Sequence, residues 1–215
     1  MKILHIICAT LMAVAFASCD EHRDFPDTAM KTCDILCTDG KVVSFEEVKS
    51  QTKTPIAVVF YVNQNEDIQG TGYAVYLKDI EPFAYSDSLG LKHNTSADIA
   101  ALDGNGNTHA MYSTGTSPAA SAVFDMWQYG QSAYIPSVAQ LYLLYDTRNK
   151  INEYIRKCGG DEILDNPDEC WYWTSTEVKE QETDKAWLFS LASGALQETP
   201  KTQVHKVRPI ITLYN

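Results

Sequence analysis

Basic residues are scarce in this chain. Among 215 residues, 17 lysines and arginines stand against 28 aspartates and glutamates, which gives a formal net charge of -11 at pH 7. A protein that holds polyphosphate without sequence preference needs an excess of positive charge on its surface. We therefore exclude nucleic acid as a partner.

Motifs for the common enzymatic chemistries are also missing. The chain has no Gly-x-Ser-x-Gly turn, no His-Glu-x-x-His helix, no phosphate-binding loop and no dinucleotide fingerprint. Four isolated histidines are expected on the surface or in strands rather than as general bases: His22, His93, His109 and His205. The sequence thus predicts no catalytic residue, no cofactor and no enzymatic activity.

Residue spacings typical of metal sites are absent too. Zinc sites are commonly built on cysteine pairs with about two residues between them, and the chain has no such pair. Asp103, Asn105 and Asn107 alternate like the start of a calcium loop. Thr108, however, stands where that loop needs glycine, and Thr114 where it needs a bidentate glutamate. We predict no metal ligand and leave a surface calcium ion open.

Long apolar runs are confined to the start of the chain. Lys2 precedes a mostly apolar segment at positions 3–16, which ends in the small residues Ala17 and Ser18. A basic start, a short apolar core and a small-residue end are typical of a secretory leader, and the core is too short for a lasting membrane span. We assign residues 1–18 to a signal peptide.

The residues around Cys19 predict how the mature chain is held. Phe16-Ala-Ser-Cys19 resembles the lipobox of bacterial lipoproteins, and this resemblance implies a lipid anchor on Cys19 as the contact with the membrane. Residues 19–31 predict a solvated tether that begins with an acidic cluster. That cluster resembles the export signal of Bacteroides-type lipoproteins, although an ordinary charged spacer is the alternative. We expect a protein anchored in the outer membrane and facing the cell exterior.

Residues 32–215 predict a single domain of the α+β class. A run of β-branched and aromatic residues at 56–62 predicts a central strand covered on both faces, and 72–77 its partner. Residues 83–108 are rich in loop formers. A strand region, two helices and a strand meander follow one another, which is an α+β order rather than an alternating parallel one.

Two helices are predicted in the middle of this domain. Ser117 caps a helix that runs to about Gln128, and Ser137 caps a second helix that runs to Cys158. The apolar stripe of the second helix rotates between its two halves, which predicts a kink or break at 146–149.

The last 45 or so residues predict an antiparallel meander. Its strands are expected at 171–176, 186–191 and 204–214. Pro209 lacks an amide hydrogen, so the last strand is expected to be an edge strand or to carry a bulge there.

Four cysteines remain in the mature domain: Cys33, Cys37, Cys158 and Cys170. They allow three full pairings in an oxidising compartment. If Cys33 and Cys37 share a strand, their Cα atoms lie about 13 Å apart, which is beyond disulfide reach. A bridge between Cys158 and Cys170, across the loop between helix and strand, is the pairing we predict.

Motifs in the second half resemble a known family. Ser137 at a helix start, Trp171-Tyr-Trp-Thr-Ser-Thr-Glu177, Trp187 and Lys206-Val-Arg208 follow one another as in the Lcl C-terminal-domain family, in its Bacteroides-type surface lipoprotein version. The resemblance implies a C-type-lectin-like fold, with two helices packed on a small curled antiparallel sheet and an N-terminal strand extension. Its motif residues are expected to be scaffold: Trp171, Trp173, Ser175, Glu177, Trp187 and Arg208.

Alternation along the strand supports that scaffold reading. Trp171, Trp173 and Ser175 share one face of the strand, so at least one tryptophan should lie in the core. Glu177 and Arg208 are expected to form a charge-assisted pair that links the meander.

These patterns predict a function class rather than a ligand. We expect a surface lipoprotein whose lectin-like head binds a glycan or a protein without catalysis. The alternative is a structural or accessory subunit of a surface assembly, such as a fimbrial tip or a nutrient-uptake complex. A cryptic oxidoreductase or hydrolase is the remaining option.

Overall fold

The structure is a computed structural model of the whole chain. It describes residues 29–64, 70–128, 131–163, 166 and 169–214. The predicted signal peptide 1–18, the predicted lipidation site Cys19 and most of the tether 19–31 lie outside the described residues. No helix in the described part is long and apolar enough to cross a membrane.

The first of two five-stranded sheets contains the N-terminal strands and has the order β12-β4-β3-β1-β2. Its strands are β1 (Ile35–Cys37), β2 (Val42–Val43), β3 (Pro55–Val62), β4 (Gly72–Tyr76) and β12 (Ile210–Leu213). β3 lies at the centre and pairs antiparallel with β4, with Val58 opposite Val75. This confirms the central strand and its partner.

The second five-stranded sheet has the order β10-β9-β8-β11-β5. Its strands are β5 (Ile80–Ala84), β8 (Trp171–Glu177), β9 (Lys185–Ser190), β10 (Leu196–Pro200) and β11 (Val204–Val207). β8, β9 and β10 form the predicted antiparallel meander. β11 instead pairs parallel with β8, Lys206 opposite Tyr172, so the prediction of a wholly antiparallel sheet was wrong. A small two-stranded sheet pairs β6 (Trp127–Gln128) with β7 (Gln131–Ser132).

Two chain segments run from one sheet into the other. β4 continues into β5, and β11 continues into β12, while β4 pairs with β12 and β5 with β11. We call this pair of segments the crossing ribbon. The strand predicted at 204–214 is thus two strands, because Arg208 and Pro209 belong to neither β11 nor β12. The expected irregularity at Pro209 is confirmed as this change of sheet.

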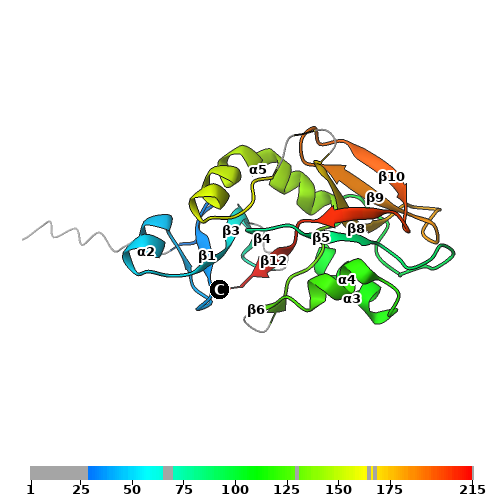
Figure 1. Cartoon of the computed structure of the whole chain (residues 1–215), viewed down its shortest axis with the longest axis horizontal. Coiled ribbons are helices and arrows are strands. Elements are labelled where there is room, and N and C mark those ends of the chain that lie inside the picture. Colours follow the sequence, from blue (N-terminus) through cyan, green and yellow to red (C-terminus); the bar gives the residue numbers. More distant parts are fainter. Residues whose placement is uncertain (1–28, 65–69, 129–130, 164–165, 167–168, 215) are drawn as a thin grey trace, which may run out of the picture.

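Helices cover opposite faces of the sheets, with α5 on one side and α3 and α4 on the other (Figure 1). The helices are α2 (Phe45–Ser50), α3 (Gly104–Ser113), α4 (Pro118–Phe124) and α5 (Val138–Lys157). The two predicted helices correspond to α4, which ends earlier than expected, and α5, whose predicted capping box is present. The helices α2 and α3 were not predicted.

α5 runs without the predicted break. Its buried stripe continues from Leu144 to Ile151 through Arg148, a charged residue at a position where an apolar one was expected. Arg148 lies over the ring of Tyr145 at 3.9 Å and donates to the carbonyl oxygens of Tyr145 and Ala192 (2.8 and 3.3 Å). A long side chain can cover apolar surface with its stem while its polar head finds acceptors. The stripe therefore continues through a charged residue.

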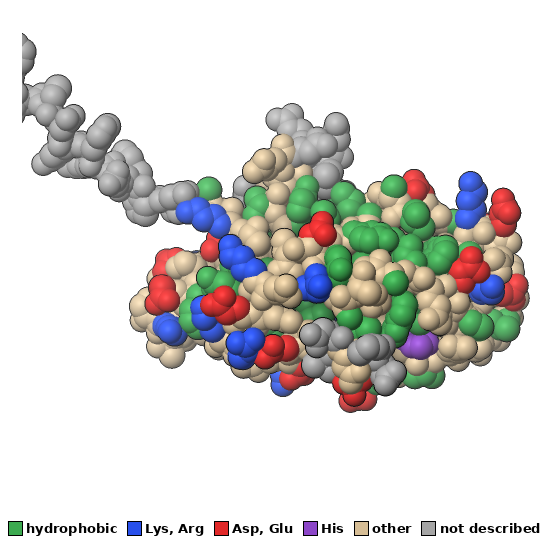
Figure 2. Space-filling model, turned by 90° about the horizontal axis from the view of Figure 1, so that it is seen from above, with side chains coloured by type: hydrophobic (Ala, Val, Ile, Leu, Met, Phe, Trp, Pro, Cys, Tyr) green, Lys and Arg blue, Asp and Glu red, His purple; other side chains and the backbone are tan. Residues whose placement is uncertain are grey.

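The core is divided by the first sheet. Val58 and Phe60 of β3 pack with the buried face of α5, whereas Ala57 and Val59 pack with residues of α3 and α4. Alternate residues of a strand point to opposite faces, so β3 serves both clusters. On the surface seen from above in Figure 2, charged side chains gather toward the two ends of the molecule, with many hydrophobic ones between them.

Candidate functional site

The predicted scaffold residues of β8 are buried, as expected for a core strand. Trp173, Ser175 and Glu177 are fully buried, and Trp171 is half-buried. The indole N–H of Trp173 donates to the Phe83 carbonyl at 3.0 Å. Trp173 is therefore the core tryptophan that strand alternation predicted.

The expected pair between Glu177 and Arg208 was wrong. Glu177 ends β8 and pairs with Lys201, just after β10, whereas Arg208 pairs with Asp79 (2.8 Å) at the break in the crossing ribbon. Glu177 is the last residue of β8, whereas Arg208 lies between β11 and β12. Each charge is instead neutralised by a partner that no motif contains.

Glu177 is the centre of a buried polar network. Its carboxylate accepts hydrogen bonds from the N–H of His93 (2.9 Å), from the N–H and hydroxyl of Thr95 (3.2 and 2.9 Å) and from Lys201. Lys201 also donates to the carbonyls of Leu91 (2.9 Å) and Glu182. The side chains of Glu177 and Lys201 are both 0% exposed. The network fastens the segment before α3 to the second sheet.

His93 belongs to this network, and the expectation of a surface or strand position was wrong for it. Its side chain is fully buried in the loop between β5 and α3. The ring nitrogens lie 3.1 Å from Lys201 Nζ and 3.2 Å from the hydroxyl of Thr116. A residue sealed in this way cannot meet a substrate.

The pKa of Glu177 reflects these contacts. Burial by itself raises the pKa of a carboxyl group. Here the hydrogen bonds from His93 and Lys201 outweigh burial and lower the pKa of Glu177 to about 2. Burial lowers the pKa of Lys201, while the Glu177 carboxylate acts in the opposite sense. Because Lys201 is surrounded by hydrogen-bond acceptors, we describe the two residues as a buried ion pair.

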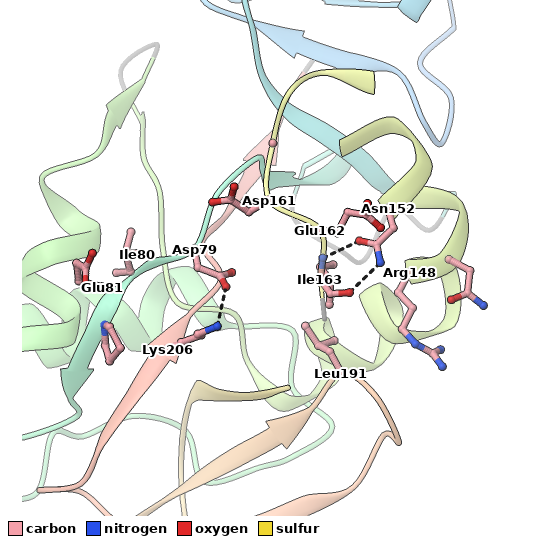
Figure 3. A pocket seen from close by; sticks show the side chains of 13 residues that line it. Asp79, Ile80, Glu81, Arg148, Asn152, Asp161, Glu162, Ile163, Leu191 and Lys206 are labelled. Carbon is pink, nitrogen blue, oxygen red and sulfur yellow. Dashed lines mark hydrogen bonds and ion pairs between the residues drawn. The ribbon is translucent and has the colours of Figure 1, made fainter. Parts of the chain in front are cut away.

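A depression lined mainly by polar residues lies near the crossing ribbon, and we call it the polar cleft (Figure 3). Its volume is about 810 Å³. It is lined by Asp79, Ile80, Glu81, Pro82, Arg148, Asn149, Asn152, Gly160, Asp161, Glu162, Ile163, Leu191 and Lys206. These residues come from the start of β5, from α5 and the segment after it, and from β11, so the cleft lies where the two sheets meet.

Asp79 holds one wall of the polar cleft. Its carboxylate accepts from Arg208 (2.8 Å) and from the hydroxyl of Tyr172 (3.2 Å), and Lys206 lies 3.8 Å away on the side facing the cleft in Figure 3. Burial, followed by the Asp79 charge, raises the pKa of Tyr172. Held in place by these donors, the Asp79 carboxylate serves as a fixed hydrogen-bond acceptor.

The opposite wall is equally fixed. The side-chain amide of Asn152 donates to the carbonyl of Ile163 and accepts from its N–H, both at 2.8 Å. Arg148 and Glu162 carry opposite charges at this wall (Figure 3). The arrangement is suited to bind a polar ligand through hydrogen bonds. It offers no thiol and no histidine for group transfer among its lining residues.

The predicted bridge between Cys158 and Cys170 was wrong, since no disulfide joins them. Cys158 caps the end of α5, and burial together with the nearby Cys37 raises the pKa of its thiol to about 11. Cys170 is buried in front of β8, where its sulfur lies 3.2 Å from the hydroxyl of Ser190. Closeness in the sequence across a loop did not bring the two sulfurs together. Cys33, also without a disulfide, lies just before β1 with φ of 79°.

The segment that alternates like a calcium loop is a helix instead. Asp103 precedes α3, and Asn107 within it donates to Asp103 (3.0 Å) and accepts from the N–H of Ser96 (2.8 Å). These oxygens are used within the fold. In the described part of the chain, no group of three or more histidine, cysteine, aspartate or glutamate residues is arranged to hold a metal ion.

Comparison with known proteins finds a structural likeness but no related sequence. No protein-family model and no curated protein matches the chain. Among solved structures it is similar to a fimbrial protein from Bacteroides ovatus ATCC 8483, with a TM-score of 0.66 and 16% sequence identity. The likeness covers 86% of this chain and 49% of that protein, so the chain spans about half the length of the fimbrial protein. At this identity the likeness shows a shared fold.

Proposed function

We propose that the chain is a lipid-anchored subunit of a fimbria-type assembly on the cell surface. The observation that carries the proposal is the shared fold with the fimbrial protein over 86% of the chain. The leader, the lipobox-like Phe16-Ala-Ser-Cys19 and the acidic tether support the same location, because all three are typical of exported lipoproteins. A fold alone does not fix a function. Here the location predicted from the sequence and the fold are consistent with the same proposal.

The proposal includes no catalysis. Glu177, Lys201 and His93 are ionisable groups near the end of β8, and all three are sealed from solvent. A catalytic group has to lie within hydrogen-bond reach of its substrate. These residues therefore support a structural role in the head of the subunit.

A ligand-binding head is the second candidate function, and the polar cleft favours it. We propose for this reading that residues 32–215 are arranged as in C-type lectins, as the motifs resembling the Lcl C-terminal-domain family imply. The packing of α5 against the β8–β9–β10 meander is compatible with that arrangement. A volume of about 810 Å³ with fixed polar groups is in the range of small-ligand sites.

Cross-linking on intact cells tests the subunit proposal. Cells that produce the full-length chain would be treated with a membrane-impermeant cross-linker, and the chain would be captured with an antibody. We expect discrete adducts that contain the same surface proteins in constant ratio. A chain recovered from the surface only as a monomer would overturn the proposal.

The matched control is Cys19→Ala, which removes the predicted lipidation site. If the anchor is at Cys19, this variant should leave the membrane fraction and lose the adducts. Retention of the variant in the outer membrane, with the adducts intact, would show that another segment holds the protein.

A further inference from the structure

A second depression, distinct from the polar cleft, lies on the outer side of β9 and β10. Its volume is about 820 Å³. It is lined by Ser96, Ala97, Asp98, Ile99, Val178, Lys179, Glu182, Trp187 and Glu198. We call it the Trp187 groove. One wall is the segment 96–99, the other is the turn 178–182, and Trp187 and Glu198 stand opposite each other in the register of β9 and β10.

The indole of Trp187 is positioned differently from that of the core tryptophan. Trp173 donates its N–H to the Phe83 carbonyl, but the N–H of Trp187 has no acceptor among the described residues. The Trp187 side chain is half-buried and this N–H is not among the buried atoms that lack a partner, so it faces solvent. Ile99 across the groove is 46% exposed. The groove thus offers an apolar aromatic surface with a free donor.

The charges of the groove balance. The three carboxylates Asp98, Glu182 and Glu198 line it together with Lys179. Lys185 pairs with Glu198 (3.0 Å) and Lys92 lies 4.0 Å from Glu182. Two of the three carboxylates thus have a lysine partner, and the remaining lining charges, Asp98 and Lys179, are opposite in sign. This balance favours a neutral ligand over a cation or an anion, while the carboxylate oxygens remain strong acceptors.

The buried ion pair fixes both walls of the groove. Thr95 donates to Glu177 and is followed directly by Ser96 of the first wall. Lys201 donates to the carbonyl of Glu182 in the second wall. Walls that are held in place before binding lose little conformational freedom when a ligand arrives. The buried network thus has a role for the groove, which is to preorganise it.

We infer that the Trp187 groove binds a neutral saccharide. The C–H face of a sugar ring is apolar and matches the electron-rich face of an indole. Its hydroxyl groups donate to carboxylates such as Asp98 and Glu198 and accept from the free indole N–H of Trp187. The volume fits a short oligosaccharide. This inference does not depend on membership of a fimbria-type assembly, since the groove belongs to the isolated fold.

The test uses the full-length chain in a detergent without a sugar headgroup. A panel of neutral di- to tetrasaccharides of glucose, galactose, mannose and N-acetylglucosamine would be added at millimolar concentration. Binding would be followed through the indole N–H resonances of the four tryptophans. We expect at least one saccharide to shift one indole resonance, the same one that is missing from the spectrum of Trp187→Phe.

Two variants make the result specific. Trp187→Ala should weaken binding of that saccharide at least about tenfold, because a central aromatic anchor is lost. Tyr142→Ala is the matched control: its ring is 40% exposed on α5 and does not line the groove, so affinity should be unchanged. The wild-type resonances provide a readout even if Trp187→Ala does not fold.

Three results would overturn the inference. No saccharide of the panel shifts an indole resonance, or the shifted resonance belongs to another tryptophan, or only an added trilysine peptide binds. The last result would assign the groove to a basic peptide instead. None of these results bears on the cross-linking experiment, so the two proposals fail separately.

Discussion

Lys201 and Arg208 are both fully buried, and each pairs with a carboxylate. The two ion pairs differ in how far the carboxylate is exposed. Lys201 and Glu177 are both 0% exposed, whereas Arg208 is 0% exposed but its partner Asp79 is 17% exposed in the wall of the polar cleft. The first pair also binds the segment around Leu91 and His93, which is remote from both residues in the sequence. The second pair braces the break in the crossing ribbon and is in contact with solvent on one side.

The comparison shows how burial changes the role of an ion pair. Removing two charges from water costs several kcal/mol per ion, and the cost is recovered only when each charge has good partners. Glu177 has four donors, so its pair is sustained within the fold. Asp79 keeps part of its surface open, and its carboxylate remains within reach of a ligand.

Replacing Lys201 should give the largest effect. Lys201→Met leaves the Glu177 carboxylate buried without its cation, and we expect a loss of about 3 to 5 kcal/mol in the free energy of unfolding. Urea denaturation measures it. The double variant Lys201→Met with Glu177→Gln should be less damaging than the sum of the single variants, since no buried charge is left alone. A loss in the double variant equal to the sum of the losses in the two single variants would show that the two residues do not form a pair.

Acid should weaken the protein by a similar but smaller amount. The pKa of Glu177 is about 2 in the folded chain, below the usual value of about 4.3 for an unfolded glutamate. Its contribution is therefore complete above the unfolded value and is lost as the pH falls toward 2. We expect the wild-type protein to lose roughly 3 kcal/mol in the free energy of unfolding through this group, and Glu177→Gln not to show this loss. Unfolding free energies measured from neutral pH downward provide the test, and identical acid profiles of the two proteins would contradict it.

Changing Arg208 should cost less than changing Lys201. Arg208→Lys keeps the charge next to Asp79 but loses the fork that also donates to the carbonyls of Leu77 (3.1 Å) and Asp161 (2.8 Å). We expect a loss of about 2 kcal/mol, because two partly buried carbonyls lose a charged donor. Thermal unfolding of the variant beside Lys201→Met ranks the two sites. A larger loss for Arg208→Lys than for Lys201→Met would show that the Arg208–Asp79 pair contributes more to stability than the Lys201–Glu177 pair.

The smallest effect is expected on the surface. Lys185→Met removes the partner of Glu198, whose carboxylate lies in an exposed pair, and we expect the smallest change in the free energy of unfolding among these variants, because water and salt screen such a pair. The same urea experiment serves as the measurement. A loss as large as that of Lys201→Met would mean that burial does not explain the difference between the pairs.

Patterns along the chain predicted the elements that have regular periodicity. The central strand β3 was predicted from a continuous apolar run, the helix α5 from its capping box and apolar stripe, and the strands β8 and β9 from apolar alternation. α3 was missed because its sequence Gly-Asn-Gly-Asn-Thr-His resembles a turn. The helix is held from outside: a Cβ on Gly104 would lie 2.8 Å from the Ile135 carbonyl, and the Thr108 hydroxyl accepts from the N–H of Ile135 (2.9 Å).

The candidate sites were less accessible to sequence reasoning. Glu177 was recognised as a motif residue, but nothing in Pro-Lys-Thr around Lys201 distinguishes a buried lysine from one in a surface turn. Asp79 and Arg208 are 129 residues apart, so their pairing depends on the crossing ribbon. Trp187 was predicted to be a scaffold residue, and its half-buried position in the Trp187 groove was not predicted. The partners of these residues follow from topology, which local patterns do not contain.

The crossing ribbon joins the two sheets through two paired segments of the chain. Both of its segments are interrupted at the same level, after Tyr76 in one and after Val207 in the other. A two-stranded connection bends most easily at such a level. Arg208 ties the two interruptions together through Leu77 and Asp79, so we expect this side chain to oppose bending of the connection between the sheets.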